Sequence, residues 1–208
     1  MANLNDHSFS EDSFLTIARE SSGIFKDRNS KFHFYAFPVE TEDDVKELLL
    51  ELRKTHYDAR HHCFAYVLGR NGESFRAVDD GEPNHSAGNP ILGQIRSFQV
   101  TNTLIVVVRY FGGTKLGMSG LINAYKTSAQ MALEANEIIR EFILESISFS
   151  FSYPEMNEVM KLVKQWDLNI LEQEMYLDCK MTLEFKESLK RELIENLLDI
   201  KNLELIKD

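Results

Sequence analysis

The segment from Asn102 to Ala132 constrains the fold more than any other, because it joins a buried strand, a glycine-rich turn and a helix. Its first part, TLIVVV, is a nearly continuous apolar run rich in β-branched residues, which is typical of a strand covered on both faces. In its last part the apolar residues recur at helical spacing. They are Met118, Leu121, Ile122, Tyr125, Ala129 and Ala132. The sequence therefore predicts a central strand that leads through a tight turn into a helix.

The turn between this strand and this helix has the features of an anion-binding site. A glycine-rich turn before a helix directs main-chain N–H groups at an anion, and glycine lets a ligand approach the backbone closely. Two cations flank the turn, together with an aromatic ring that could stack on a base. The predicted anion or RNA site contains Arg109, Tyr110, Gly112, Gly113, Lys115, Gly117 and Gly120. In the alternative interpretation, the glycines only form a tight connection and the aromatic residues pack beneath it.

The distribution of charge supports an anionic partner for this region. Residues 83–133 contain no Asp or Glu, whereas the whole chain has a net charge of −10. The basic residues of the segment are Arg96, Arg109, Lys115 and Lys126. A basic island within an acidic protein predicts a local anionic partner rather than a general affinity for polyanions.

A second motif, DDGEP at residues 79–83, follows a short predicted strand at residues 75–78. Its three carboxylates, on Asp79, Asp80 and Glu82, could bind a hard cation such as Mg²⁺. Carboxylates at a turn also accept hydrogen bonds from main-chain N–H groups, and we favour this capping role. The sequence thus predicts no bound metal and no cofactor.

Three segments together resemble the YigZ/Impact family. They are DARHHCFAYVLG (residues 58–69), AVDDGEPNHSAGNPIL (residues 77–92) and VVVRYFGGTKLGMSGLINAY (residues 106–125). The resemblance extends over about residues 30–133. Its loop motif contains Asp79, Asp80, Gly81, Glu82, Pro83, Ser86, Ala87, Gly88 and Pro90. Family members usually have Gly-Thr where this chain has His85 and Ser86. Serine can replace the threonine hydroxyl, but we expect histidine to be a poor substitute for a glycine at positive φ.

The resemblance implies an α+β fold of two domains. The N-terminal domain, residues 1–140, is expected to be similar to the second domain of ribosomal protein S five, with a mixed sheet and helices on one face. Residues 141–208 look like the smaller domain of bacterial members, which is similar to the fifth domain of elongation factor G. Eukaryotic Impact relatives regulate translation initiation during starvation by binding a partner protein, so the resemblance also implies a role in translation.

The residues after position 140 independently show the element order of a ferredoxin-like domain. Apolar patterns predict strands at residues 147–152, 168–176, 179–185 and 203–206, and helices that begin at Pro154 and at Ser188. The resulting order, βαββαβ, belongs to a self-contained ferredoxin-like unit. We therefore predict a domain boundary at residues 140–146.

The N-terminal half begins with predicted strands at residues 14–18 and 31–39, joined by a hairpin link. Thr41 then serves as the N-cap of a helix whose first turn is acidic. His61 and His62 precede the next strand, at residues 63–68, and being adjacent they face opposite sides of it. Adjacent histidines of this kind are a poor pair of ligands for one metal ion.

Three functions remain open from the sequence. The first, which we favour, is a translation-associated regulator that binds RNA or the ribosome through the basic strand–turn–helix. The second is a small-molecule enzyme that binds a phosphate or a nucleotide with the acidic loop and the glycine-rich turn, although its catalytic residues cannot be assigned. The third is a regulator that binds proteins through the acidic C-terminal domain without nucleic acid. The sequence contains no apolar run long enough to span a membrane and shows no basic, apolar export signal, so we expect a cytoplasmic protein.

Overall fold

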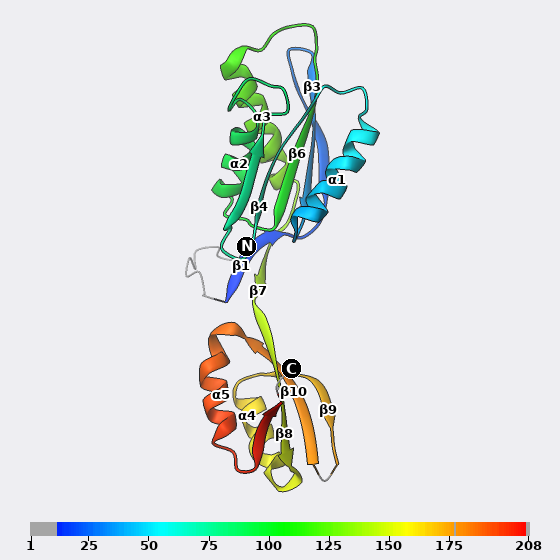
Figure 1. The fold of residues 1–208 in the computed structure, drawn as a ribbon. Helices are drawn as coiled ribbons and strands as arrows, with labels where there is room; N and C mark the ends of the chain where they lie inside the picture. The colour runs from blue at the N-terminus through cyan, green and yellow to red at the C-terminus, as the bar shows by residue number, and fades with distance from the viewer. Residues whose placement is uncertain (1–11, 177, 207–208) are drawn as a thin grey trace. The chain divides into compact units, whose positions relative to one another are not determined.

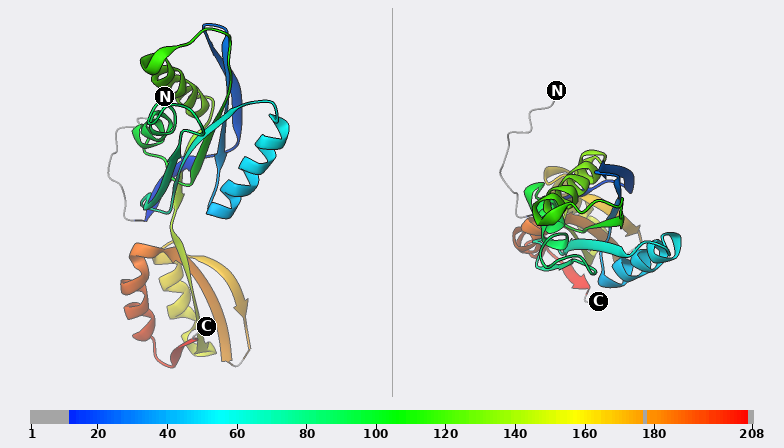
Figure 2. Two further views of the ribbon diagram at one scale, coloured as in Figure 1. Left: turned by 45° about the horizontal axis from the view of Figure 1, so that its top comes forward. Right: turned by 90° about the horizontal axis from the view of Figure 1, so that it is seen from above.

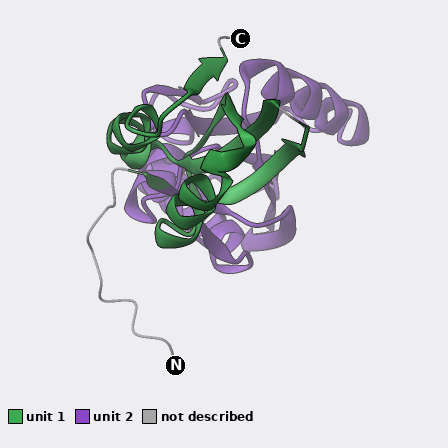
Figure 3. Cartoon of the chain, turned by 90° about the horizontal axis from the view of Figure 1, so that it is seen from below, with its two compact units in different colours: residues 1–13, 142–208 green, residues 14–141 purple. Residues whose placement is uncertain are grey.

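The computed structural model describes residues 12–176 and 178–206. Within these residues the chain forms two compact units (Figure 3). The larger unit contains residues 14–141, and the smaller contains the described residues from 142 onward together with residues 12 and 13. Each unit has its own hydrophobic core. The predicted α+β fold class with two parts is confirmed.

The larger unit is built on a five-stranded sheet in the order β2-β3-β6-β4-β5. Its strands are β2 (Ser21–Asp27), β3 (Ser30–Pro38), β4 (His61–Leu68), β5 (Ser74–Val78) and β6 (Thr103–Tyr110). Strand β6 lies in the middle, and its residues from Thr103 to Arg109 are all buried, as the apolar run predicts. Every neighbouring pair of strands is antiparallel, so the sheet is not the mixed one that was expected.

Helices cover both faces of this sheet (Figures 1 and 2). Helices α2 (Gly88–Ser97) and α3 (Gly117–Glu134) pack on one face, and α1 (Glu42–Thr55) packs on the other. The expectation of helices on one face is therefore wrong. The reason lies in β6, where Val107 enters the core under α2 and α3 while Val106 enters the core under α1. A strand that is apolar on both sides has to be covered on both sides.

The predicted hairpin link between residues 18 and 31 instead contains the strand β2. Strand β2 pairs with β3, and the hairpin turn places Arg28 and Asn29 at φ values of 44° and 65°. Two successive residues at positive φ match the twist of the flanking strands. The preceding strand, β1 (Ser13–Ile17), pairs with β7 (Ile138–Phe142) in a separate two-stranded sheet.

The smaller unit has the predicted ferredoxin-like order, βαββαβ. Its elements are β8 (Leu144–Ser152), α4 (Met156–Gln165), β9 (Asn169–Glu174), β10 (Asp178–Lys186), α5 (Lys190–Leu198) and β11 (Leu203–Ile206). The short 3-10 helices η1 (Tyr153–Glu155) and η2 (Glu187–Leu189) precede α4 and α5. The sheet order is β11-β8-β10-β9, and one of its faces packs against both helices. No helix among the described residues is long and apolar enough to span a membrane.

Candidate functional site

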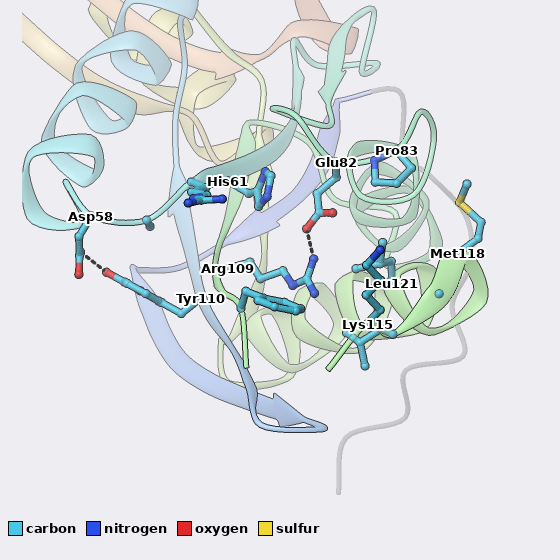
Figure 4. A pocket seen from close by; sticks show the side chains of 14 residues that line it. Asp58, His61, Glu82, Pro83, Arg109, Tyr110, Lys115, Met118 and Leu121 are labelled. Carbon is cyan, nitrogen blue, oxygen red and sulfur yellow. Dashed lines mark hydrogen bonds and ion pairs between the residues drawn. The ribbon is translucent and has the colours of Figure 1, made fainter. Parts of the chain in front are cut away.

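A cavity of about 740 Å³ opens where β6 ends and α3 begins (Figure 4). Residues 58–61 line it at the start of β4, and residues 82–83 line it from the loop after β5. Residues 109–111 and 115–118 contribute the end of β6 and the start of α3. The cavity therefore joins the two sequence motifs, the acidic loop and the glycine-rich turn, although they are far apart in the chain.

Arg109 and Glu82 form a buried ion pair at this cavity. The Nη1 atom of Arg109 lies 2.6 Å from Oε1 of Glu82, and the two residues are only 7% and 8% exposed. The hydroxyl of Tyr125, on α3, donates to the same Oε1 atom at 2.9 Å. Arg109 is therefore a paired, buried cation rather than a free charge at the mouth of the turn, and Glu82 is not available as a metal ligand.

The ion pair continues into the core through Tyr125 and Cys63. The Cys63 thiol lies 3.3 Å from the Tyr125 hydroxyl and 2.9 Å from the carbonyl oxygen of Asp79. Burial raises the pKa of Cys63, and it also raises the pKa of Tyr125 well above the ordinary value. Both groups stay protonated at neutral pH, so Cys63 is a core residue and not a nucleophile.

The mouth of the cavity carries exposed cations beside the start of α3. Lys115 and Arg60 are exposed, and neither forms an ion pair within the described part of the chain. No side chain caps the N-terminus of α3, where Leu116 occupies the N-cap position. The first N–H groups of a helix have no partner within the helix and carry its positive dipole end. This arrangement can hold an anion.

The glycines of the turn have different tasks. A Cβ atom on Gly112 would lie 2.0 Å from the main-chain carbon of Asn29, so Gly112 is required where the turn packs against the β2–β3 hairpin. Gly113 and Gly117 adopt φ values of 85° and 73° with open space beside them. Gly120 packs against Leu116. Of the seven residues predicted for the site, Arg109, Tyr110, Lys115 and Gly117 line the cavity, and Gly112, Gly113 and Gly120 do not.

Asp79 has the capping role. Its carboxylate accepts hydrogen bonds from the main-chain N–H groups of His85, Ala87 and Gly88 at 2.8–2.9 Å. Burial raises the pKa of Asp79, but these three donors outweigh burial and lower the pKa below its ordinary value. The N-terminus of α2 is thus occupied by a carboxylate of the protein itself.

The rest of the acidic loop is also held by the protein. Asp80 accepts a hydrogen bond from the main-chain N–H of His62 at 2.7 Å and forms an ion pair with Arg53 at 3.1 Å. Within the described residues, no group of three histidine, cysteine or acidic side chains is arranged to hold a metal ion.

The remaining loop residues shape the connection into α2. The buried hydroxyl of Ser86 donates to the carbonyl of Pro83 at 2.6 Å. A Cβ atom on Gly88 would lie 2.5 Å from the main-chain nitrogen of Val78, and Pro90 lies in the first turn of α2.

His85 does adopt the conformation that was expected to require glycine. Its φ is 64°. Its main-chain N–H donates to the carboxylate of Asp79 at 2.8 Å, and its ring Nδ1 atom lies 2.9 Å from the side-chain nitrogen of Asn89. Histidine is therefore accommodated in the left-handed conformation at this position, with hydrogen bonds to its main chain and its ring.

Tyr110 belongs to a second cluster of polar aromatic residues at the side of the cavity. Its hydroxyl donates to Asp58 at 2.9 Å, and His56 lies between Tyr110 and Tyr35, at 2.9 and 2.7 Å from their hydroxyls. Since a carboxylate can only accept, the proton of Tyr110 lies toward Asp58, and Nδ1 of His56 donates to Tyr110. Burial and the neighbouring Asp58 raise the pKa of Tyr110 to about 12. Tyr110 is thus fixed within the protein and is not free to stack on a base.

The sequence of this chain is similar to those of known proteins over most of its length. The family model of the Impact N-terminal domain matches residues 28–133, which is about half of the chain. The IMPACT family member YvyE of Bacillus subtilis is 33% identical over 93% of this chain and 92% of its own length. The chain belongs to the IMPACT family.

Other IMPACT relatives agree with this assignment over smaller parts of the chain. The family member YigZ of Escherichia coli is 32% identical over 77% of this chain and 79% of its own length. The Protein IMPACT of Rattus norvegicus is 30% identical over 53% of this chain but only 36% of its own length. A crystal structure described as that of a hypothetical protein is 27% identical, covers 95% of this chain and 98% of its own, and has a TM-score of 0.67.

Sequence reasoning did not single out several of the cavity residues, and two of these are polar groups at the start of β4. Arg60 lies outside the basic island, and His61 was considered only as half of a metal pair with His62. His61 does face the opposite side from its neighbour, as predicted: His61 lines the cavity, whereas His62 is 3% exposed. The sequence signal that could have found both residues is their position at the start of the apolar run that forms β4.

Proposed function

We propose that this IMPACT family protein is a translation-associated regulator that binds single-stranded RNA at the cavity between β6 and α3. The observation that carries the proposal is the uncapped start of α3 beside the exposed Lys115 and Arg60. Backbone N–H groups at a helix start and cationic side chains are the groups that contact phosphate oxygens in nucleic-acid complexes, and the helix dipole favours negative charge there. The role in translation rests on the family resemblance, and it would place the protein in the cytoplasm.

Further cations lie near the same turn. The Gly112 N–H donates to Ser30 Oγ at 3.2 Å, so the tip of the β2–β3 hairpin packs against the glycine-rich turn. This tip carries the exposed residues Arg28 and Lys31. A phosphate backbone that leaves the cavity on this side would meet these cations next. The smaller unit is less suited to RNA, because residues 153–208 contain 13 acidic and 8 basic residues.

The acidic loop argues against the enzyme hypothesis. Its three carboxylates are already bound to main-chain N–H groups, to Arg53 and to Arg109. They are therefore not free to bind a metal ion or to take up a proton from a substrate. The cavity retains binding groups, but the loop offers no free base.

The test is fluorescence anisotropy with a labelled single-stranded RNA between ~50 and ~200 mM salt, a range over which several phosphate contacts cost orders of magnitude in affinity. Lys115→Glu and Arg60→Glu should each weaken binding for all sequences alike and reduce the salt dependence by roughly one phosphate contact. Lys126→Glu is the matched control, because Lys126 is an exposed cation of α3 that does not line the cavity. Equal affinity in all four proteins would overturn the RNA site and leave a protein-binding regulator as the leading hypothesis.

A further inference from the structure

His61 is held in one tautomer at the wall of the cavity. Its Nδ1 atom lies 2.9 Å from the carbonyl oxygen of Asp80, and a carbonyl can only accept a hydrogen bond. Nδ1 therefore carries the proton, and in the neutral ring Nε2 is an acceptor. Gly81 makes this contact possible, because a Cβ atom there would lie 3.3 Å from Nδ1 and its φ is 86°. The motif loop thus serves to orient His61.

The residue beside His61 on the sheet is Arg109. The two are direct partners in the antiparallel register of β4 and β6, so their side chains lie on the same face. Both line the cavity, and Figure 4 shows them together with Glu82. Arg109 uses Nη1 for Glu82, whereas its buried Nε–H has no hydrogen-bond partner among the described residues. Among the described residues, neither His61 Nε2 nor Arg109 Nε has a hydrogen-bond partner, and both side chains line the same cavity.

The acceptor of His61 and the donor of Arg109 together restrict which chemical group can satisfy both side chains. A phosphate or carboxylate oxygen only accepts, so beside the neutral ring it would leave the lone pair of His61 Nε2 without a donor. A methyl or methylene group would leave both side chains without partners, and unmade hydrogen bonds in a buried site are costly. A hydroxyl group satisfies both, since its O–H donates to Nε2 while its oxygen accepts from the guanidinium.

We propose that His61 and Arg109 bind the ribose 2′-hydroxyl of a nucleotide whose phosphate lies at the start of α3, so that the site selects RNA over DNA. The proposal rests on the function proposed above and names the group that it recognises. The 2′-hydroxyl is the donor and acceptor that distinguishes RNA from DNA at a given site. Lys115 and Arg60 contribute affinity for either nucleic acid, because phosphate carries no such information.

The experiment compares three labelled oligonucleotides of one sequence by fluorescence anisotropy on the full chain: RNA, DNA, and RNA with 2′-fluoro groups. The fluoro group keeps the RNA-like sugar shape but cannot donate a hydrogen bond. Wild type should bind RNA more tightly than both others, by roughly two- to ten-fold, which corresponds to one hydrogen bond. Equal binding of RNA and 2′-fluoro RNA would overturn the proposal without any mutation.

Variants assign the effect to His61. His61→Phe keeps a ring but removes the acceptor, so its preference for RNA over DNA should fall to about one while binding of DNA is retained. His61→Gln can still accept and should keep part of the preference. Lys115→Glu should weaken RNA and DNA equally and leave the ratio unchanged. If the His61→Phe protein is folded and keeps the full preference, the proposal is wrong. If wild type binds neither RNA nor DNA, the proposed function itself fails, which is a different result.

Discussion

The Nη1 atom of Arg109 lies 2.6 Å from Oε1 of Glu82, and the two side chains are almost completely buried. The pair connects β6 to the loop after β5 and therefore links the two family motifs. Removing one partner of a buried ion pair leaves an uncompensated charge, whereas replacing both with apolar groups of similar shape can be nearly neutral. The pair should thus show strong thermodynamic coupling.

Glu82→Gln should lower the free energy of unfolding by about 3–5 kcal/mol, because Arg109 would remain buried without a counter-charge. The double variant Glu82→Gln/Arg109→Met should lose clearly less than the sum of the two single variants. Urea unfolding of the four proteins measures this coupling. Additive losses would mean that the two side chains do not interact in solution as they do here.

Asp79 should contribute more to stability than Asp80, because it accepts from three main-chain N–H groups and Asp80 from one. Asp79→Asn replaces one acceptor oxygen with a donor and should cost about 0.5–2 kcal/mol, as the loss of a helix cap does. Asp80→Asn should cost less. Folding lowers the pKa of Asp79 below its ordinary value of 3.8. The ionised carboxylate therefore contributes its full share to the free energy of unfolding above pH 3.8. This contribution is lost as the pH falls through the lower pKa of the folded state. Thermal unfolding between pH 7 and acidic pH tests both points. A larger loss in Asp80→Asn would contradict the ranking, and an equal loss from Asp79→Asn at pH 7 and at a pH below the folded value would contradict the pH dependence.

Features of the fold that depend on neighbouring residues could be predicted from the sequence, whereas features that depend on contacts between distant segments could not. The N-cap of α1 is a local signal, and the predicted capping by Thr41 is confirmed by reciprocal hydrogen bonds with Asp44 at 3.1 and 2.8 Å. The strand β6 follows from its continuous apolar run and the helix α3 from its apolar periodicity, and both signals are local. Strand β2 was missed because Ser21 and Ser22 begin it and Gly23 interrupts it, and only pairing with β3 makes this segment a strand.

The site required information that a single sequence does not contain. Arg109 and Glu82 are 27 positions apart, and nothing local indicates that this carboxylate rather than another pairs with the arginine. The same holds for His61, whose role depends on the carbonyl of Asp80, 19 positions away. Residue types and motifs could therefore locate the region, but the state of each group within it depends on tertiary contacts.

The buried His62 should make the protein less stable as the pH falls. Burial lowers its pKa below the ordinary 6.5, Arg53 lowers it further, and Asp80, 4.0 Å away, acts in the opposite direction. Well above pH 6.5 the ring is neutral in both states and has no effect on stability. Below this pH the unfolded chain takes up the proton first, so the free energy of unfolding decreases until the pH reaches the lower folded value.

His62→Leu should make the decrease in stability below pH 6.5 shallower, although burial also lowers the pKa values of His33 and His56, which remain. His85→Asn is the control, because this ring is exposed and asparagine tolerates positive φ. Urea unfolding at several pH values measures the slope. An unchanged slope in His62→Leu would show that this ring does not control the acid sensitivity.

Gly112 and Gly113 should respond differently to the same substitution. Alanine at 112 places its Cβ against the main chain of Asn29, which cannot move without displacing the hairpin. Alanine at 113 meets nothing within 4 Å and carries only the strain of its positive φ, about 1–2 kcal/mol. Gly112→Ala should therefore lower the unfolding midpoint more than Gly113→Ala does. The opposite order would mean that the turn does not pack on the hairpin.

The two units should fold independently when they are separated at residue 141. The smaller unit has its own core, in which Phe149, Leu183 and Leu193 are fully buried, and this core does not include residues of the larger unit. We expect the fragments 1–141 and 142–208 each to give the circular dichroism of a folded domain and a cooperative thermal transition. The smaller fragment should be less stable than the same unit in the full chain, because it loses Asp12, whose carboxylate accepts hydrogen bonds from the N–H and the hydroxyl of Ser188. Asp12→Ala in the full chain is the matched variant and should destabilise the smaller unit alone. An unfolded fragment 142–208 would contradict the proposed boundary and show that the smaller unit depends on the larger one.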